Sequence, residues 1–79
     1  MNKLAKNIQI GDTVRASAYW IVVKEINEGF QKNGKRVVKV SGDRVFKSES
    51  EKNGVLKTWG EEARTAIESY KENTKVSYK

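Results

Sequence analysis

The sequence contains no cysteine, no histidine and no proline. Without cysteine, the chain has no disulfide framework, no thiolate nucleophile and no cysteine-based metal cluster. Without histidine, it has no Ser-His-Asp triad, no imidazole metal ligand and no side chain whose unperturbed pKa lies near neutral pH. Hydrolysis would need carboxylates or a lysine with strongly shifted pKa values. We therefore predict no catalytic residue, no metal site and no cofactor, and we expect a protein that is not an enzyme.

Long apolar segments are also missing. The longest apolar run covers residues 18–23, which is six residues, whereas a membrane-spanning helix needs about 20. Residues 1–12 include Lys3 and Lys6 but no apolar stretch of the kind found in a secretory signal. We therefore expect a cytoplasmic protein without a membrane partner.

Positive charge is in excess and is unevenly spread. The 79 residues are enough for a single small domain, 1–79, with 16 Lys and Arg against 10 Asp and Glu and a net charge of +6. Residues 29–57 hold eight of the bases and three of the acids, which is +5. A bias of this kind favours an acidic partner, and nucleic acid is the commonest one.

Short runs of aromatic and β-branched residues alternate with turn residues, which predicts an antiparallel meander. The predicted strands are an opening strand at 12–17, four further strands at 19–23, 36–40, 44–47 and 55–59, and a closing strand at 76–78. Asn33-Gly34 and Asn53-Gly54 are strong hairpin signals, with type I′ turns expected. Gly42-Asp43 is expected to form another turn, and Trp20 and Phe46 are expected to lie in the core.

One segment near the C-terminus has the period of a helix instead. Its apolar stripe consists of Ala63, Ala66, Ile67 and Tyr70. This i, i+3, i+4, i+7 spacing is typical of an amphipathic helix. Thr58 and Glu61 match the pattern of a capping box. We therefore predict one helix at about 59–72.

Three short motifs resemble the start of SH3-like small barrels of the KOW and Tudor type. They are Ile-x-Ile-Gly-Asp-x-Val at 8–14, the spaced residues Trp20, Val22 and Ile26, and Val-x-Val at 38–40. The resemblance covers residues 8–47, about half of the chain. It implies a mainly β fold, an antiparallel meander forming an SH3-like small barrel, here with one added helix. Its free edges would be covered by the chain's own tail or by a second copy, so we expect a monomer or a homodimer.

The basic middle of the chain is the main candidate for a binding surface. Lysine and arginine spaced along strands can neutralise successive phosphates, and an exposed aromatic ring can stack on a base. Phe30 has no apolar neighbour in the sequence, so we expect it to be exposed. The predicted nucleic-acid contacts are Lys32, Lys35, Arg36, Lys39, Arg44 and Lys47 on phosphates, with Phe30 stacking. Binding to DNA or RNA should have little sequence specificity, because no recognition helix is predicted.

Other interpretations of the same residues remain open. Lysines also cover the outer face of ordinary soluble sheets, where they prevent edge-to-edge aggregation. A protein–protein interaction module that docks on and modulates a larger complex is the alternative function, with Phe30 as an anchor in the hairpin 27–34. A cage for a methylated cation would need several rings around one site. Its candidate rings are Tyr19, Trp20, Phe46 and Trp59.

Overall fold

The computed structural model describes residues 1–79, and the fold is mainly β. The strands are β1 (Asn2–Leu4), β2 (Thr13–Arg15), β3 (Trp20–Phe30), β4 (Arg36–Val45), β5 (Thr65–Lys71) and β6 (Lys75–Ser77). The helix α1 covers Glu49–Trp59, and two short 3-10 turns, η1 and η2, cover Ala5–Asn7 and Glu61–Arg64. The predicted class, an antiparallel β fold with one helix, is confirmed. No helix is long and apolar enough to cross a membrane.

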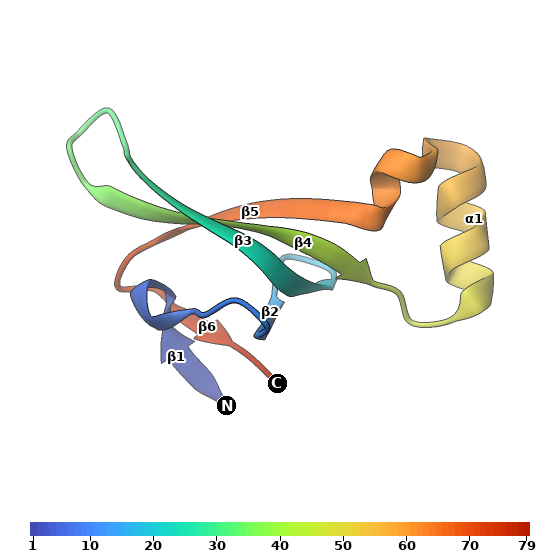
Figure 1. The fold of residues 1–79 in the computed structure, drawn as a ribbon, viewed down its shortest axis with the longest axis horizontal. Coiled ribbons are helices and arrows are strands. Elements are labelled where there is room, and N and C mark those ends of the chain that lie inside the picture. Colours follow the sequence, from blue (N-terminus) through green and yellow to red (C-terminus); the bar gives the residue numbers. More distant parts are fainter.

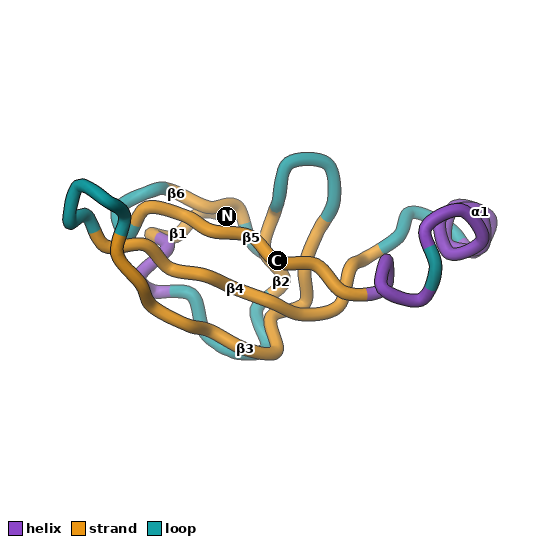
Figure 2. Tube along the Cα trace, turned by 90° about the horizontal axis from the view of Figure 1, so that it is seen from above, coloured by secondary structure: helices purple, strands orange, loops and turns teal.

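Four strands form an antiparallel sheet in the order β2-β3-β4-β5, which curls into a half-barrel (Figure 2). The short strands β1 and β6 pair with each other and lie below this sheet, with both termini close together (Figure 1). Val14 of β2 forms a bridge with Tyr78, directly after β6, and Lys79 N–H donates to the Thr13 carbonyl at 2.8 Å. The two ends of the chain therefore partly close the open side of the curled sheet.

A part-buried ion pair ties the N-terminal segment to the start of β2. The Nζ atom of Lys3 lies 2.7 Å from Oδ2 of Asp12. The same carboxylate oxygen accepts a hydrogen bond from the Gln9 N–H at 2.9 Å. These two contacts hold the pKa of Asp12 below its ordinary value, with the Lys3 hydrogen bond as the larger cause.

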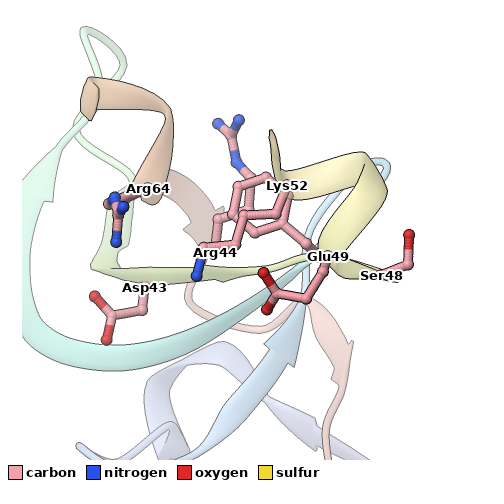
Figure 3. A pocket seen from close by; sticks show the side chains of 7 residues that line it. Asp43, Arg44, Ser48, Glu49, Lys52 and Arg64 are labelled. Carbon is pink, nitrogen blue, oxygen red and sulfur yellow. The ribbon is translucent and has the colours of Figure 1, made fainter. Parts of the chain in front are cut away.

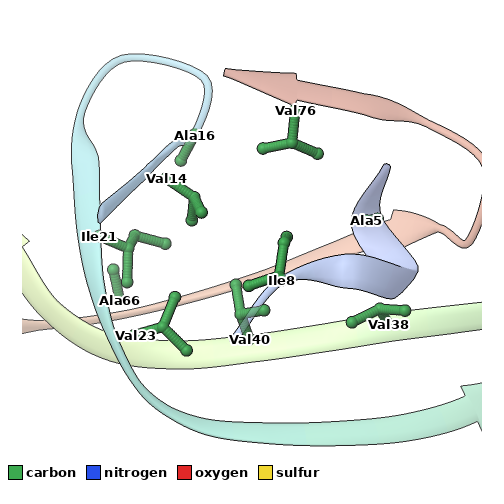
Figure 4. Close-up of a cluster of buried hydrophobic side chains, with 10 residues drawn as sticks. All are labelled: Ala5, Ile8, Val14, Ala16, Ile21, Val23, Val38, Val40, Ala66 and Val76. Carbon is green, nitrogen blue, oxygen red and sulfur yellow. The ribbon is translucent and has the colours of Figure 1, made fainter. Parts of the chain in front are cut away.

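The core consists only of small and β-branched side chains (Figure 4). Its buried members are Ala5, Ile8, Val14, Ala16, Ile21, Val23, Val38, Val40, Ala66 and Val76. Trp20 and Phe46 are half-buried and lie outside this cluster, so the prediction that they form the core is wrong. Side chains alternate along a strand, and Ile21 and Val23 occupy the inner face of β3, which leaves Trp20 on the outer face. Phe46 lies beyond the end of β4.

The predicted turn at Gly42-Asp43 is also wrong, because β4 continues through it without a break. The register between β3 and β4 shifts between Val23 and Glu25, so Lys24 is the additional residue of a β-bulge. Opposite the bulge, a Cβ atom on Gly42 would lie only 1.9 Å from the carbonyl oxygen of Val22. Glycine is therefore required here for the close approach of the two strands, and the bulge bends the sheet.

The helix begins earlier than predicted, and residues 55–59 belong to it rather than to a strand. Ser48 Oγ accepts a hydrogen bond from the Glu51 N–H at 3.1 Å, and a Glu51 carboxylate oxygen accepts one from the Lys47 N–H at 2.9 Å. This N-terminal cap uses the residue pattern Ser-x-x-Glu and starts α1. Asn53-Gly54 therefore lies inside a helix and forms no hairpin.

The helix predicted at about 59–72 is wrong, because most of that segment forms η2 and β5. The stripe that suggested a helix includes Ala66 and Tyr70, whose spacing of four fits a helical period and also the two-residue period of a strand. All seven residues of β5 pair with β4, so this segment forms a strand rather than a helix. The Tyr70 hydroxyl then donates to the Arg15 carbonyl at 2.8 Å and joins β5 to β2 across the inside of the curl.

Substituting the two structurally distinct glycines gives a test of the bulge. We expect Gly42→Ala to destabilise the protein by about 3 kcal/mol. The new methyl group would overlap with backbone atoms of β3, which cannot move aside as a flexible side chain could. Gly54→Ala is the matched control, since nothing lies within 4 Å of its added Cβ. In a helix interior this change should stabilise by about 0.5–1 kcal/mol. Urea denaturation of both variants measures the difference, and equal stabilities would contradict the assigned role of Gly42.

Alkaline pH should weaken the contribution of Tyr70 to the stability of the fold. Burial, with smaller contributions from Glu68 and Tyr19, raises the pKa of Tyr70 to about 12 from an ordinary value of 10.0. The stabilisation from the neutral phenol is therefore complete below pH 10.0 and is lost as the pH rises to about 12. Wild type should lose more free energy of unfolding than Tyr70→Phe between pH of about 9 and about 11. Parallel pH profiles of the two proteins in urea denaturation would contradict this.

Candidate nucleic-acid interface

The β3–β4 hairpin ends in a five-residue loop, residues 31–35, that projects from the core (Figure 1). Gly34 N–H donates to the Gln31 carbonyl at 2.9 Å, and Gln31 N–H donates to the Lys35 carbonyl at 2.8 Å. Gly34 has φ +80, whereas Asn33 has no positive φ. The predicted turn at Asn33-Gly34 is therefore confirmed, but it is a type I turn followed by a left-handed glycine rather than type I′.

A hollow of about 590 Å³ lies beside this turn. Its lining residues are Phe30, Gly34, Lys35, Arg36, Lys71, Glu72 and Asn73. Phe30 and Arg36 face each other across β3 and β4, and Lys71 closes the surface from the end of β5. Residues from the ends of three neighbouring strands therefore line one hollow, with Phe30 and Arg36 on the inner face of the sheet and Lys71 on its outer face.

Phe30 is 76% exposed, which confirms the expectation that it lies on the surface. Its cross-strand partner is Arg36, and the only other nonpolar residue lining the hollow is Gly34. A ring that is three-quarters exposed gains little stability from packing. It is free to stack on a planar group of a ligand.

Positive charge surrounds the ring. Lys32, Lys35 and Lys71 form no ion pair within the chain. Arg36 pairs with Glu28, which lies two residues before Phe30 on the same side of β3. Exposed pairs of this kind are weak, so the guanidinium can exchange its carboxylate partner for a phosphate. Glu72 is the other carboxylate at this end, which leaves four cations against two acids.

The remaining predicted contact residues do not share this surface. Lys39 lies one position out of phase with the buried Val38 and Val40, and so occupies the outer face of the sheet. Because residues in a strand rise about 3.3 Å each, Arg44 is about 26 Å along β4 from Arg36. Lys47 lies beyond Arg44, next to α1. The predicted basic residues therefore do not share a single face of the sheet. They lie at both ends of β4 and on both faces of the sheet.

Four residues of the hollow were not among the predicted binding residues: Gly34, Lys71, Glu72 and Asn73. Lys71 and Glu72 were assigned to the end of a helix, whereas Lys71 is the last residue of β5, which pairs with β4, and Glu72 and Asn73 follow it. The alternation of Thr65, Ile67, Ser69 and Lys71 outside with Ala66 and Tyr70 inside is the signal that could have found the strand.

Two of the four candidate cage rings contact cations of the chain itself, and a third is exposed on the helix. Trp20 lies against Lys79 Nζ at 4.5 Å from its ring centre, and Tyr19 lies 4.5 Å from the Arg44 guanidinium carbon. Trp59 is 75% exposed at the end of α1. Two of the rings thus contact the chain's own cations, which occupy the positions that a methylated cation would need.

Comparison with known proteins identifies no relative. None of the protein-family models matches the chain, and no curated protein and no solved structure matches it either. The assignment of the hairpin end as the candidate interface therefore rests on its exposure, charge and shape.

Proposed function

We propose that this protein binds single-stranded nucleic acid through the end of its β3–β4 hairpin, as a non-enzymatic module of the cytoplasm. Phe30 stacks on an unpaired base, while Lys32, Lys35, Arg36 and Lys71 neutralise the adjacent phosphates. The observation that carries this proposal is the exposed Phe30 ring in a hollow that Lys35, Arg36 and Lys71 also line. Stacking rings with basic neighbours are the common elements of single-strand binding sites.

Single strands are favoured over a duplex for two reasons. Stacking on Phe30 needs a base that is already unpaired. A duplex is usually read by a basic helix in the major groove, whereas α1 carries Glu49 and Glu51 against Lys52 and Lys57 and has no net charge. Stacking and phosphate contacts do not read base edges, so binding has little sequence specificity.

The proposal includes the finer fold assignment, an SH3-like barrel of the KOW and Tudor type. The antiparallel order β2-β3-β4-β5 and the return of the chain to β2 through the Val14–Tyr78 bridge support it. In this arrangement α1 and η2 are an insertion between the strands β4 and β5. The hairpin end lies away from this insertion (Figure 1).

Two kinds of substitution should affect binding differently. Phe30→Ala removes stacking, so the affinity for a fluorescein-labelled oligothymidylate should fall about five- to hundredfold with an unchanged salt dependence. Lys35→Gln and Lys71→Gln each remove one phosphate contact, and each should reduce the slope of log K against log salt by about 0.7. Fluorescence anisotropy between about 50 and about 200 mM salt measures both quantities.

Lys57→Gln provides the matched control, since it removes the same charge from the exposed side of α1. Wild-type affinity in Phe30→Ala, or an equal loss of slope in Lys57→Gln, would refute the hairpin site. Absence of binding to DNA and RNA oligonucleotides at low salt would refute the proposed function as a whole.

Docking on a protein complex is the second candidate, and Trp59 is the observation that favours it. This ring is 75% exposed on a helix that buries no residue and projects from the sheet (Figure 1). Exposed tryptophans are frequent hot spots of interfaces. Trp59→Ala should leave the melting temperature unchanged and abolish capture of a protein partner that wild type retains. Equal capture by the variant would exclude this role of Trp59.

A further inference from the structure

A second hollow lies at the opposite end of β4, where the chain passes into α1 (Figure 3). It has a volume of about 440 Å³. Its lining residues are Asp43, Arg44, Phe46, Ser48, Glu49, Lys52 and Arg64. The volume is in the range of small-molecule sites, and the lining is polar except for one aromatic ring.

Three cations reach this hollow from three different elements: Arg44 from β4, Lys52 from α1 and Arg64 from η2. Arg44 and Lys52 form no ion pair within the chain, whereas Arg64 pairs with Glu61. Two of the positive charges at the hollow therefore have no ion-pair partner.

Arg44 is held in an unusual state. Its Nε atom is buried and is the single buried side-chain nitrogen or oxygen in the protein without a hydrogen-bond partner. The guanidinium carbon lies 4.5 Å from the centre of the Tyr19 ring, so stacking fixes the group in place. Buried donors without acceptors are rare in folded proteins, and binding of an ion beside the group is one accepted explanation.

Two carboxylates that line the hollow, those of Asp43 and Glu49, would repel a bound anion. Asp43 lies 3.9 Å from Lys24 Nζ, which offsets its charge. Glu49 has no ion-pair partner and remains the main source of repulsion. Three cations and two carboxylates leave a positive balance, and removing the charge of Glu49 should increase it.

We infer that this hollow binds a phosphate group through Arg44, Lys52 and Arg64. The planar guanidinium of arginine matches two phosphate oxygens, and lysine adds a compact charge. The Phe46 ring, the one hydrophobic lining residue, provides a surface for the base of a nucleoside phosphate. This site is independent of the hairpin end, because no residue lines both hollows.

The Arg44 Nε–H group gives its own signal in a ¹H–¹⁵N spectrum, which Arg44→Lys identifies by removing it. Inorganic phosphate and adenosine 5′-monophosphate are the two probes, titrated into the full chain at low salt. We expect a saturable shift of this signal with at least one of them. No saturable shift with either probe would overturn the inference, whether or not the hairpin binds oligonucleotides.

Substitutions locate the site. Arg44→Gln and Lys52→Gln should each weaken probe binding about tenfold, as the loss of a charge-assisted hydrogen bond does. Glu49→Gln should tighten binding, and Lys57→Gln, on the exposed side of the same helix, should leave it unchanged. Backbone amide shifts report binding in variants that lack the Nε–H signal, and melting temperatures show that each is folded. An equal loss in Lys57→Gln would reduce the effect to general attraction by a basic protein and overturn the assignment.

Comparison of the two probes distinguishes the sources of the phosphate. If Phe46 supports a base, adenosine 5′-monophosphate should bind more tightly than inorganic phosphate, and Phe46→Leu should remove the difference. Equal affinities would support a site for a free phosphate group. Either result supports a phosphate site. If neither probe binds, the site is refuted.

Discussion

The close approach of β3 and β4 at the Lys24 bulge is the constraint on which the rest of the fold depends. A Cβ on Gly42 would overlap with the backbone of β3, so only glycine allows the two strands to pair through the bulge. Bulges bend a sheet and increase its twist, and this bend turns the four-stranded sheet into a half-barrel. The curl lets Tyr70 of β5 reach the carbonyl of Arg15 on β2. It also gives the small valine and isoleucine side chains a common interior.

The same two strands are longer than the core that they enclose, and this difference creates both candidate binding surfaces. Between Val38 and the hairpin loop, the inner face of the two strands carries no buried apolar residue. Phe30 and Arg36 lie on this part of the face. At its other end, β4 continues to Arg44 before the chain turns into α1. The hydrophobic interior thus lies in the middle of β4, with a basic hollow at each end. The excess positive charge of the sequence is divided between these two places, which suits ligands that carry phosphates.

Some features could be predicted from sequence because they depend on local chemistry. The alternating residues of the opening strand, the turn at Asn33-Gly34 and the exposure of Phe30 are of this kind. Other features depend on pairing between distant segments. Gly42 looks like a turn residue until the bulge of β3 is placed opposite it, and Ala66 and Tyr70 fit a helix and a strand equally well until β4 is beside them. Lys71 was therefore missed, and Arg44 was grouped with residues that lie at the other end of β4.

The central claim is that the hairpin end, rather than the protein's general positive charge, binds single-stranded nucleic acid. Titration of the ¹⁵N-labelled protein with a short oligothymidylate, followed by ¹H–¹⁵N amide shifts, tests it most directly. The account predicts saturable shifts concentrated at Phe30–Arg36 and Lys71–Asn73, with the amides of β1 and β6 unaffected. Small shifts spread over all lysine-rich surfaces, or shifts confined to α1, would contradict it.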